Sequence, residues 1–278
     1  VEYVATKETG YMSLPKPGRF ILDDICHWRD VIKAPDISHI DWETMPKKER
    51  ERGDRTQTSV TATIHVGYFQ QLMNFMGFTE GLCAMLEEPD EVMALFEYMN
   101  QFYLQICSKV RDYYKPDVWA ITDDTATATN PFISVEMYRE MIKPFHASEA
   151  KFAQEAGIPI DMHDCGRCED FIEDWLDFGV CAWNPAQTMN DLAGIKKKYG
   201  NSLVLEGCWD SSGPAGWPDT SEEVVRAEVR KCIDNFAPGG GFVFWASTYG
   251  APDDEAIKAK ARWITEEYDS YGRNFYRK

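Results

Sequence analysis

From residue 58 onward the chain alternates short apolar, β-branched segments with longer helical patterns. This alternation is typical of parallel βα units, because each return to a parallel neighbouring strand needs a crossover helix. The strand segments are continuously apolar, which indicates that both of their faces are buried. No GxGxxG turn of the kind found in open dinucleotide-binding sheets follows an early strand. We therefore predict an α/β fold of the (β/α)8, or TIM-barrel, type.

The number of predicted strands is smaller than a closed barrel needs. A closed barrel has eight strands, whereas six are predicted from residue 58 onward. Either the earlier residues supply strands, or the barrel lacks its first strand in this chain. The predicted strands are 58–66, 117–123, 158–163, 179–183, 202–208 and 241–247. The predicted helices are 68–76, 79–86, 89–113, 134–156, 168–178, 189–199, 220–236 and 253–270.

The chain is predicted to form one domain. Its 278 residues are enough for a single barrel, and no low-complexity segment or clear linker divides them. We assign an irregular N-terminal part to residues 1–57 and the βα units to residues 58–278. Within the irregular part, the patterns predict a hairpin over 3–22, a short helix near 24–33 and a charged loop over 46–55.

The charge balance excludes two classes of partner. The chain has 46 acidic and 29 basic residues, which gives a net charge of −17. Nucleic acids and anionic membranes both require basic surface, so neither is a predicted partner. No apolar run reaches the roughly 18 residues of a membrane span, and no signal peptide opens the chain, so we predict a cytoplasmic protein. The eight cysteines are expected to be reduced thiols, because a core of this size needs no disulfides.

Polar residues follow the predicted strands at their C-terminal ends, where the chemistry of parallel barrels is located. The residues at these ends are His65, Asp123, Asp124, His163, Cys165, Trp183, Asn184, Glu206, Cys208, Asp210 and Ser247 to Tyr249. We take Asp123, Asp124, Glu206 and Tyr249 as catalytic candidates. Asp123 and Asp124 have an equally good structural interpretation as caps of the following segment. His65 is better explained as a hydrogen-bonded core histidine, and Asn184 as turn packing.

The segment "IPIDMHDCGRC" (158–168) places three soft metal-ligand types within six residues. His163 and Cys165 stand two positions apart at a strand end, so their side chains share one face. Cys168 is three residues further on and is expected to enter the next helix and leave that face. A thioredoxin-like redox pair fits less well, because its helix would begin within the CxxC motif and His163 has no place in that motif.

Four segments resemble one known family. They are "ISVEMYREMIKPFH" (133–146), "MHDCG" (162–166), "LVLEGCWD" (203–210) and "PGGGFVFWASTYGAPDD" (238–254). Together they resemble the uroporphyrinogen decarboxylase superfamily from about Asp23 to the C-terminus. Within it they are most similar to the branch of cobalamin-dependent methyltransferases related to methylcobalamin:coenzyme M methyltransferase. The family carries further residues before the position matching Val1, including the first strand, and their absence here would explain the missing strands.

The resemblance implies a zinc site and a methyl transfer reaction. In the methyltransferase branch, "MHDCG" supplies two zinc ligands, and a cysteine in the turn after the last strand supplies the third. That turn here is "STYGAP" (247–252), without a cysteine. We therefore predict the zinc ligands His163, Cys165 and Cys208, with Glu206 as an oxygen alternative to Cys208. The implied function is a corrinoid-dependent methyltransferase acting in zinc-assisted demethylation of a small methylated substrate.

The implied partners are a small methyl donor or acceptor, a separate protein that carries methylcobalamin or another corrinoid, and a second copy of the chain in a homodimer. Two alternatives remain open. The first is a uroporphyrinogen decarboxylase or related carbon–carbon lyase, although Phe75 and Tyr249 replace the active-site Tyr and His of decarboxylases and their Arg-bearing segment is absent. The second is a non-catalytic binding protein that keeps the fold without the metal.

Overall fold

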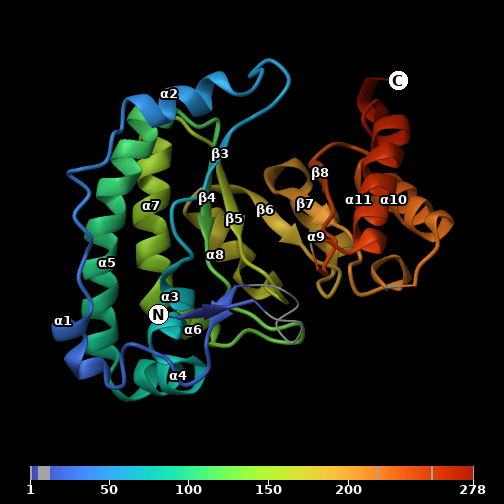
Figure 1. Ribbon diagram of the computed structural model, residues 1–278. Coiled ribbons are helices and arrows are strands. Elements are labelled where there is room, and N and C mark those ends of the chain that lie inside the picture. Colours follow the sequence, from blue (N-terminus) through green and yellow to red (C-terminus); the bar gives the residue numbers. More distant parts are fainter. Residues whose placement is uncertain (1, 6–12, 218, 252, 278) are drawn as a thin grey trace.

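The computed structural model describes residues 2–5, 13–217, 219–251 and 253–277. Its centre is a six-stranded parallel sheet with the strand order β3-β4-β5-β6-β7-β8, which follows the chain (Figure 1). The strands are β3 (Thr61–Ala62), β4 (Val118–Thr122), β5 (Ile160–His163), β6 (Val180–Ala186), β7 (Val204–Cys208) and β8 (Phe242–Trp245). A strand is found at each of the six predicted positions, each paired in parallel with the next, although only Thr61–Ala62 of the strand predicted over 58–66 is formed. The fold is thus α/β and TIM-like.

The sheet forms a half-barrel. Within the described residues, β3 and β8 are edge strands that do not pair with each other. The described part of residues 1–57 adds no strand to this sheet. It forms a separate antiparallel pair instead, β1 (Tyr3–Val4) with β2 (Leu14–Pro15). The predicted hairpin therefore exists as this pair, and its residues 6–12 lie outside the described residues.

The helices cover one face of the sheet, and α5 and α7 run side by side along it (Figure 1). The predicted helices are found with bounds shifted by at most a few residues. They are α1 (Trp28–Val31), α3 (Tyr68–Met76), α4 (Phe78–Glu87), α5 (Pro89–Lys109), α6 (Val135–Met137), α7 (Lys143–Glu155), α8 (Ile172–Asp177), α9 (Leu192–Tyr199), α10 (Glu222–Phe236) and α11 (Glu255–Glu267). No helix in the described ranges combines the length and the apolar character that crossing a bilayer would require.

The loop predicted for the charged stretch 46–55 is wrong, because most of it lies in helix α2 (Thr44–Glu51). Asp41 stabilises the start of this helix, since its Oδ1 accepts the backbone N–H groups of Glu43 and Thr44 at 3.1 and 3.0 Å. Arg50 fixes the other end by donating to the backbone carbonyl of Tyr113. Lys, Glu and Arg are good helix formers, so this charged composition is compatible with a surface helix once both ends are held.

Side chains alternate between the two faces of the sheet. Trp119 on β4 donates from Nε1 to Glu149 on α7 at 2.7 Å, and Trp183 on β6 packs on Trp175 of α8, so these residues face the helices. The intervening residues face the concave side, which we call the inner wall. The inner wall consists of Thr61, Val118, Ala120, Thr122, Asp161, His163, Ala182, Asn184, Val204, Glu206, Val243 and Trp245.

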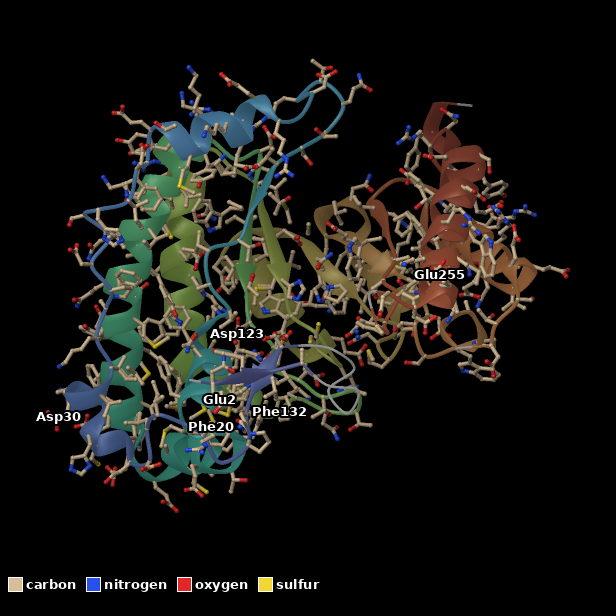
Figure 2. The ribbon with its side chains drawn as sticks, in the orientation of Figure 1. Glu2, Phe20, Asp30, Asp123, Phe132 and Glu255 are labelled. Atoms are coloured by element: carbon tan, nitrogen blue, oxygen red, sulfur yellow. The ribbon has the colours of Figure 1, made fainter. Side chains whose placement is uncertain are left out.

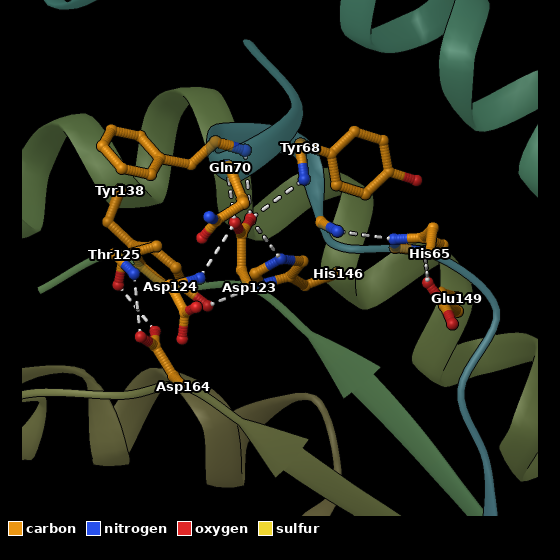
Figure 3. Close-up of polar contacts among 12 residues, drawn as sticks. His65, Tyr68, Gln70, Asp123, Asp124, Thr125, Tyr138, His146, Glu149 and Asp164 are labelled. Carbon is orange, nitrogen blue, oxygen red and sulfur yellow. Dashed lines mark hydrogen bonds and ion pairs between the residues drawn. The ribbon is translucent and has the colours of Figure 1, made fainter. Parts of the chain in front are cut away.

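Asp123 fixes helix α3 to the end of β4. Its Oδ2 accepts the backbone N–H groups of Tyr68 and Phe69 at 3.0 and 3.1 Å, and its Oδ1 accepts that of Gln70 at 2.9 Å (Figure 3). Its side chain lies in the interior, in contrast to the peripheral Asp30 (Figure 2). A carboxylate at a helix N-terminus satisfies free N–H donors and the helix dipole together. Gly67 precedes the helix at φ +97°, where an added Cβ would lie 2.3 Å from the Asp123 carboxyl carbon.

Replacing Asp123, which holds helix α3 at the end of β4, should destabilise the fold strongly. Asp123→Ala leaves three buried N–H groups without acceptors, so we expect the free energy of unfolding to fall by about 3–5 kcal/mol. The matched control is Ser221→Ala, which removes the exposed N-cap of α10 and should cost about 1 kcal/mol. Urea unfolding followed by circular dichroism measures both changes. A loss for Asp123→Ala no larger than that of the control would contradict this role.

Candidate metal centre

Three ligand-type side chains meet at the C-terminal rim of β4 and β5. Asp124 follows β4, His163 ends β5, and Cys165 lies two residues further on. One ligand atom from each lies within 4.8 Å of the other two. The His163 Nε2 and Cys165 Sγ atoms are 3.8 Å apart, close to the roughly 3.6 Å expected for two ligands of a tetrahedral zinc with ordinary Zn–N and Zn–S bonds. The structure thus brings together both ligands predicted from "MHDCG".

A hydrogen bond that His163 donates to Asn184 sets the orientation of the His163 ring. The distance between His163 Nδ1 and Asn184 Oδ1 is 2.7 Å. Because an amide oxygen only accepts hydrogen bonds, Nδ1 carries the proton and Nε2 keeps its lone pair. That lone pair faces Cys165. A histidine held in this way through its other nitrogen is typical of metal sites.

The turn after His163 is fixed by its backbone. The Cys165 N–H donates to Asp124 Oδ1 at 3.0 Å, and the Gly166 N–H donates to Gln187 Oε1 at 2.6 Å. Gly166 has φ +104°, and an added Cβ would lie 2.6 Å from the backbone oxygen of Thr127. A larger residue at this position would therefore displace the turn, which explains why a glycine follows Cys165.

Asn190 supports the same turn from the next βα loop. Its Oδ1 accepts the N–H groups of Cys168 and Glu169 at 2.9 and 3.1 Å, and its Nδ2 donates to the Gly166 carbonyl at 2.9 Å. Cys168 is buried, with its thiol directed to the backbone oxygen of Cys165 at 3.2 Å. As predicted, Cys168 begins the following helical segment and is not part of the ligand cluster.

Asp164 lies between the two ligands but has a structural task. Its side chain is fully buried and accepts the N–H and the hydroxyl of Thr125 at 2.8 and 2.6 Å (Figure 3). Burial raises the pKa of its carboxyl well above the usual range. The side chain thereby connects the segments after β4 and β5, which are the two segments that carry the ligands.

The cluster favours a bound cation. Burial raises the pKa of the Cys165 thiol well above its usual range, and the adjacent charge of Asp124 raises it further. Burial also raises the pKa of Asp124. Both groups are thus held toward their neutral forms when no cation is near them. A divalent metal ion offsets both effects, because it stabilises the thiolate and the carboxylate together.

The geometry does not support Cys208 as the third ligand. Cys208 ends β7, which β6 separates from β5, so its backbone lies about 10 Å from that of His163. Its thiol is buried in the apolar core, and the charge acting on it is that of Lys196 on α9. Gly207 and Cys208 have φ values of 118° and 58°, which breaks the alternation of the strand. Asp124, which the sequence predicts as a catalytic residue, takes the place in the cluster that is predicted for Cys208.

The remaining catalytic candidates occupy different places. Asp123 is fully buried and engaged with α3, which fits the cap interpretation and leaves it no route to a substrate. Glu206 is half-buried on the inner wall, where burial raises its pKa and a hydrogen bond from Asn184 lowers it. Tyr249 is 54% exposed in the segment after β8, outside the ligand cluster.

Sequence reasoning missed Asp161. It lies on the inner wall two residues before His163, only 6% exposed, and its Oδ1 has no hydrogen-bond partner. Burial, and then the charge of Glu206, raise its pKa to about 7. The signal was present in "IPIDMH", where an aspartate interrupts an apolar strand on the face that His163 shares. Perturbed carboxyls of this kind are typical of functional sites.

The unpaired carboxyl should make the metal-free protein less stable as pH rises. A carboxyl whose pKa is raised on folding stabilises the fold only below its unfolded pKa of about 4. That contribution is lost as pH rises toward about 7. Asp161→Asn removes this dependence, so its advantage over wild type should grow from near zero at pH 4 to about 2–4 kcal/mol at pH 8. Urea unfolding at both pH values measures the free energies of unfolding of the variant and of wild type. If the difference between them does not change with pH, the raised pKa of Asp161 is contradicted.

Comparisons with known proteins agree with this architecture. The chain is similar in structure to a methyltransferase from Methanosarcina mazei, with a TM-score of 0.60 and 16% sequence identity over 81% of this chain. It spans 62% of the length of that methyltransferase. A search of curated proteins found no match. The sequence pattern of the uroporphyrinogen decarboxylase (URO-D) family matches residues 36–255. Since this match extends over most of the chain, the protein belongs to the uroporphyrinogen decarboxylase family.

Proposed function

We propose that this protein is a zinc-dependent methyltransferase that demethylates a small substrate and passes the methyl group to a corrinoid on a separate protein. The observation that carries the proposal is the cluster of Asp124, His163 and Cys165, with the His163 lone pair oriented by Asn184. The fold shared with the Methanosarcina mazei methyltransferase supports the same reaction class.

The donor set fits zinc. A nitrogen, a sulfur and an oxygen ligand suit this borderline-soft ion, and three protein ligands leave one position for a substrate. When bound, zinc would act as a Lewis acid that keeps a thiol or hydroxyl group deprotonated near neutral pH. Asn184 keeps the His163 ring in its metal-binding tautomer. The backbone turn at Gly166 keeps Cys165 beside it, and Asp124 receives the Cys165 N–H.

The inner wall argues against decarboxylation of a porphyrinogen. A substrate with several carboxylates needs cationic partners when it leaves water. The ionisable residues at the inward positions of the six strands are Asp161, His163 and Glu206, and no lysine or arginine is among these positions. Carboxylates on this wall would repel such a substrate. Turnover of uroporphyrinogen by the purified protein would favour the decarboxylase alternative.

Metal content separates the methyltransferase from a non-catalytic binding protein. Protein purified without chelator should contain about one zinc per chain. His163→Ala and Cys165→Ala should each lose at least nine-tenths of it, and methyl transfer to free cobalamin should fall in parallel. Asp124→Asn should weaken zinc binding at least tenfold, since it removes an anionic ligand. Elemental analysis and competition with a chromophoric chelator measure these changes.

The matched control for this experiment is Cys208→Ala, which removes a thiol on the same rim outside the cluster. We expect it to keep its zinc. Loss of zinc from Cys208→Ala with retention by Asp124→Asn would show that our corrected ligand set is wrong.

Asn184 should act on metal affinity without touching the metal. Asn184→Ala frees the His163 ring to rotate and to change tautomer, so zinc affinity should fall about 10–100-fold. Asn201→Ala, an exposed asparagine before β7, is the control and should leave affinity unchanged. Chelator competition measures both. A less than threefold change for Asn184→Ala would show that the hydrogen bond to His163 does not support the site.

A further inference from the structure

Glu206 lies on the inner wall at the same level as His163. Strand β5 pairs His163 with Asn184 on β6, and the register of β6 with β7 pairs Ala182 with Val204. Two residues further along both strands, Asn184 and Glu206 therefore stand side by side and face inward. The side chains of His163, Asn184 and Glu206 thus form one row across three neighbouring strands.

The side chain of Asn184 interacts with both of its neighbours in this row. Its Oδ1 lies 2.7 Å from His163 Nδ1. Burial raises the pKa of Glu206, and a hydrogen bond from the Asn184 side chain lowers it, which places the amide N–H of Asn184 toward the carboxylate. Glu206 is half-buried, so this hydrogen bond is stronger than it would be on an open surface. The Asn184 amide therefore bridges the histidine and the carboxylate.

The two ends of the Asn184 amide differ in the hydrogen bonds that they can make. The oxygen only accepts hydrogen bonds, and the nitrogen only donates them. A neutral histidine can meet either end, because its Nδ1 accepts in one tautomer and donates in the other. An ionised carboxylate can only accept, so Glu206 requires the nitrogen end. The oxygen end is then left for His163, and the proton of the His163 ring must reside on Nδ1.

The other neighbours of these side chains do not make this choice. Among the described residues, the Asn184 side chain has no hydrogen-bond partner besides His163 and Glu206. The Cys165 Sγ atom lies 3.8 Å from Nε2 of the His163 ring, and a thiol is a weak donor. A reversal of the Asn184 amide is therefore opposed mainly by Glu206.

We propose that Glu206 is a positioning residue that sets the tautomer of His163 through Asn184. The carboxylate keeps the amide oxygen on His163 Nδ1 and thereby keeps the lone pair of Nε2 directed to the candidate metal centre. Groups that support a metal ligand from outside commonly affect metal affinity almost as much as the ligands do. The effect on zinc rests on the proposed function, whereas the effect on the His163 tautomer requires no metal.

Nitrogen-15 NMR of the metal-free protein, labelled at its histidines, measures the tautomer directly. The chain has five histidines, and His163→Ala identifies the signal of His163. At about pH 8.5, where an ordinary histidine is neutral, wild type should carry the His163 proton almost entirely on Nδ1. Glu206→Leu should move a large share of it to Nε2. Glu206→Gln, whose side-chain oxygen can still accept from Asn184, should keep most of it on Nδ1.

Zinc competition tests whether Glu206 acts through Asn184. Glu206→Leu should weaken zinc binding about 10–100-fold, and Glu206→Gln clearly less. The double variant Glu206→Leu/Asn184→Ala should lose no more affinity than Asn184→Ala alone, because both substitutions remove the same support. The matched control is Glu228→Leu, which removes a half-buried glutamate that pairs with Lys231 on α10, and it should bind zinc like wild type.

Two results would overturn the proposal. One is a His163 tautomer in Glu206→Leu that equals that of wild type. The other is a double variant whose loss of zinc affinity is the sum of the two single losses, because Glu206 would then act independently of Asn184, as a ligand or a base would. Wild type that binds no zinc refutes the proposed function, yet a tautomer change in Glu206→Leu still supports the positioning role. Zinc binding with an unchanged tautomer refutes the positioning role and leaves the zinc assignment standing.

Discussion

The parallel pairing of β4 with β5 is the constraint on which the candidate site depends. Thr122 pairs with His163, and the Asp123 N–H continues the ladder by donating to the His163 carbonyl at 2.9 Å. This register places Asp124, the next residue of one strand, beside the end of the other. Metal ligands must lie within a few ångströms of one another. A shift of one residue in the register of β4 against β5 would turn Asp124 toward the helices and separate it from His163 and Cys165.

Adjacent acidic residues at this rim have opposite tasks because a strand alternates its side chains. Asp123 and Asp164 turn toward the helices and the neighbouring loop, where each accepts several N–H or hydroxyl donors and is fully buried. Asp124 and Cys165 turn the other way, and each places a ligand atom within 4.8 Å of the ligand atom of His163. In each of the pairs Asp123–Asp124 and Asp164–Cys165, the first residue holds the backbone in place and the second residue is a candidate ligand.

The sequence was sufficient to locate the strands and their crossover helices, because each buried strand and each crossover helix has a distinct pattern. It was also sufficient for His163 and Cys165, since their two-residue spacing determines a shared face. It was insufficient for the third ligand. Asp124 and Cys208 both end strands at one rim, and only the strand order shows that Asp124 is one strand from His163 and Cys208 is two. The left-handed backbone at Cys208, which turns its side chain off the inner wall, has no marker in the sequence beyond Gly207.

Asp161 is the buried carboxyl whose needs the described fold does not satisfy, since its Oδ1 has no hydrogen-bond partner. Elsewhere in the described chain, buried carboxylates have partners: His65 and Trp119 contact Glu149, and Arg139 and Lys143 contact Asp174. Asp161 has alanines on both sides at the positions where such partners could stand. Larger polar residues there could stabilise the protein by hydrogen-bonding the carboxylate. A buried carboxyl without a partner is held toward its neutral form, and for this reason its pKa is raised and its cost to the folded state grows with pH.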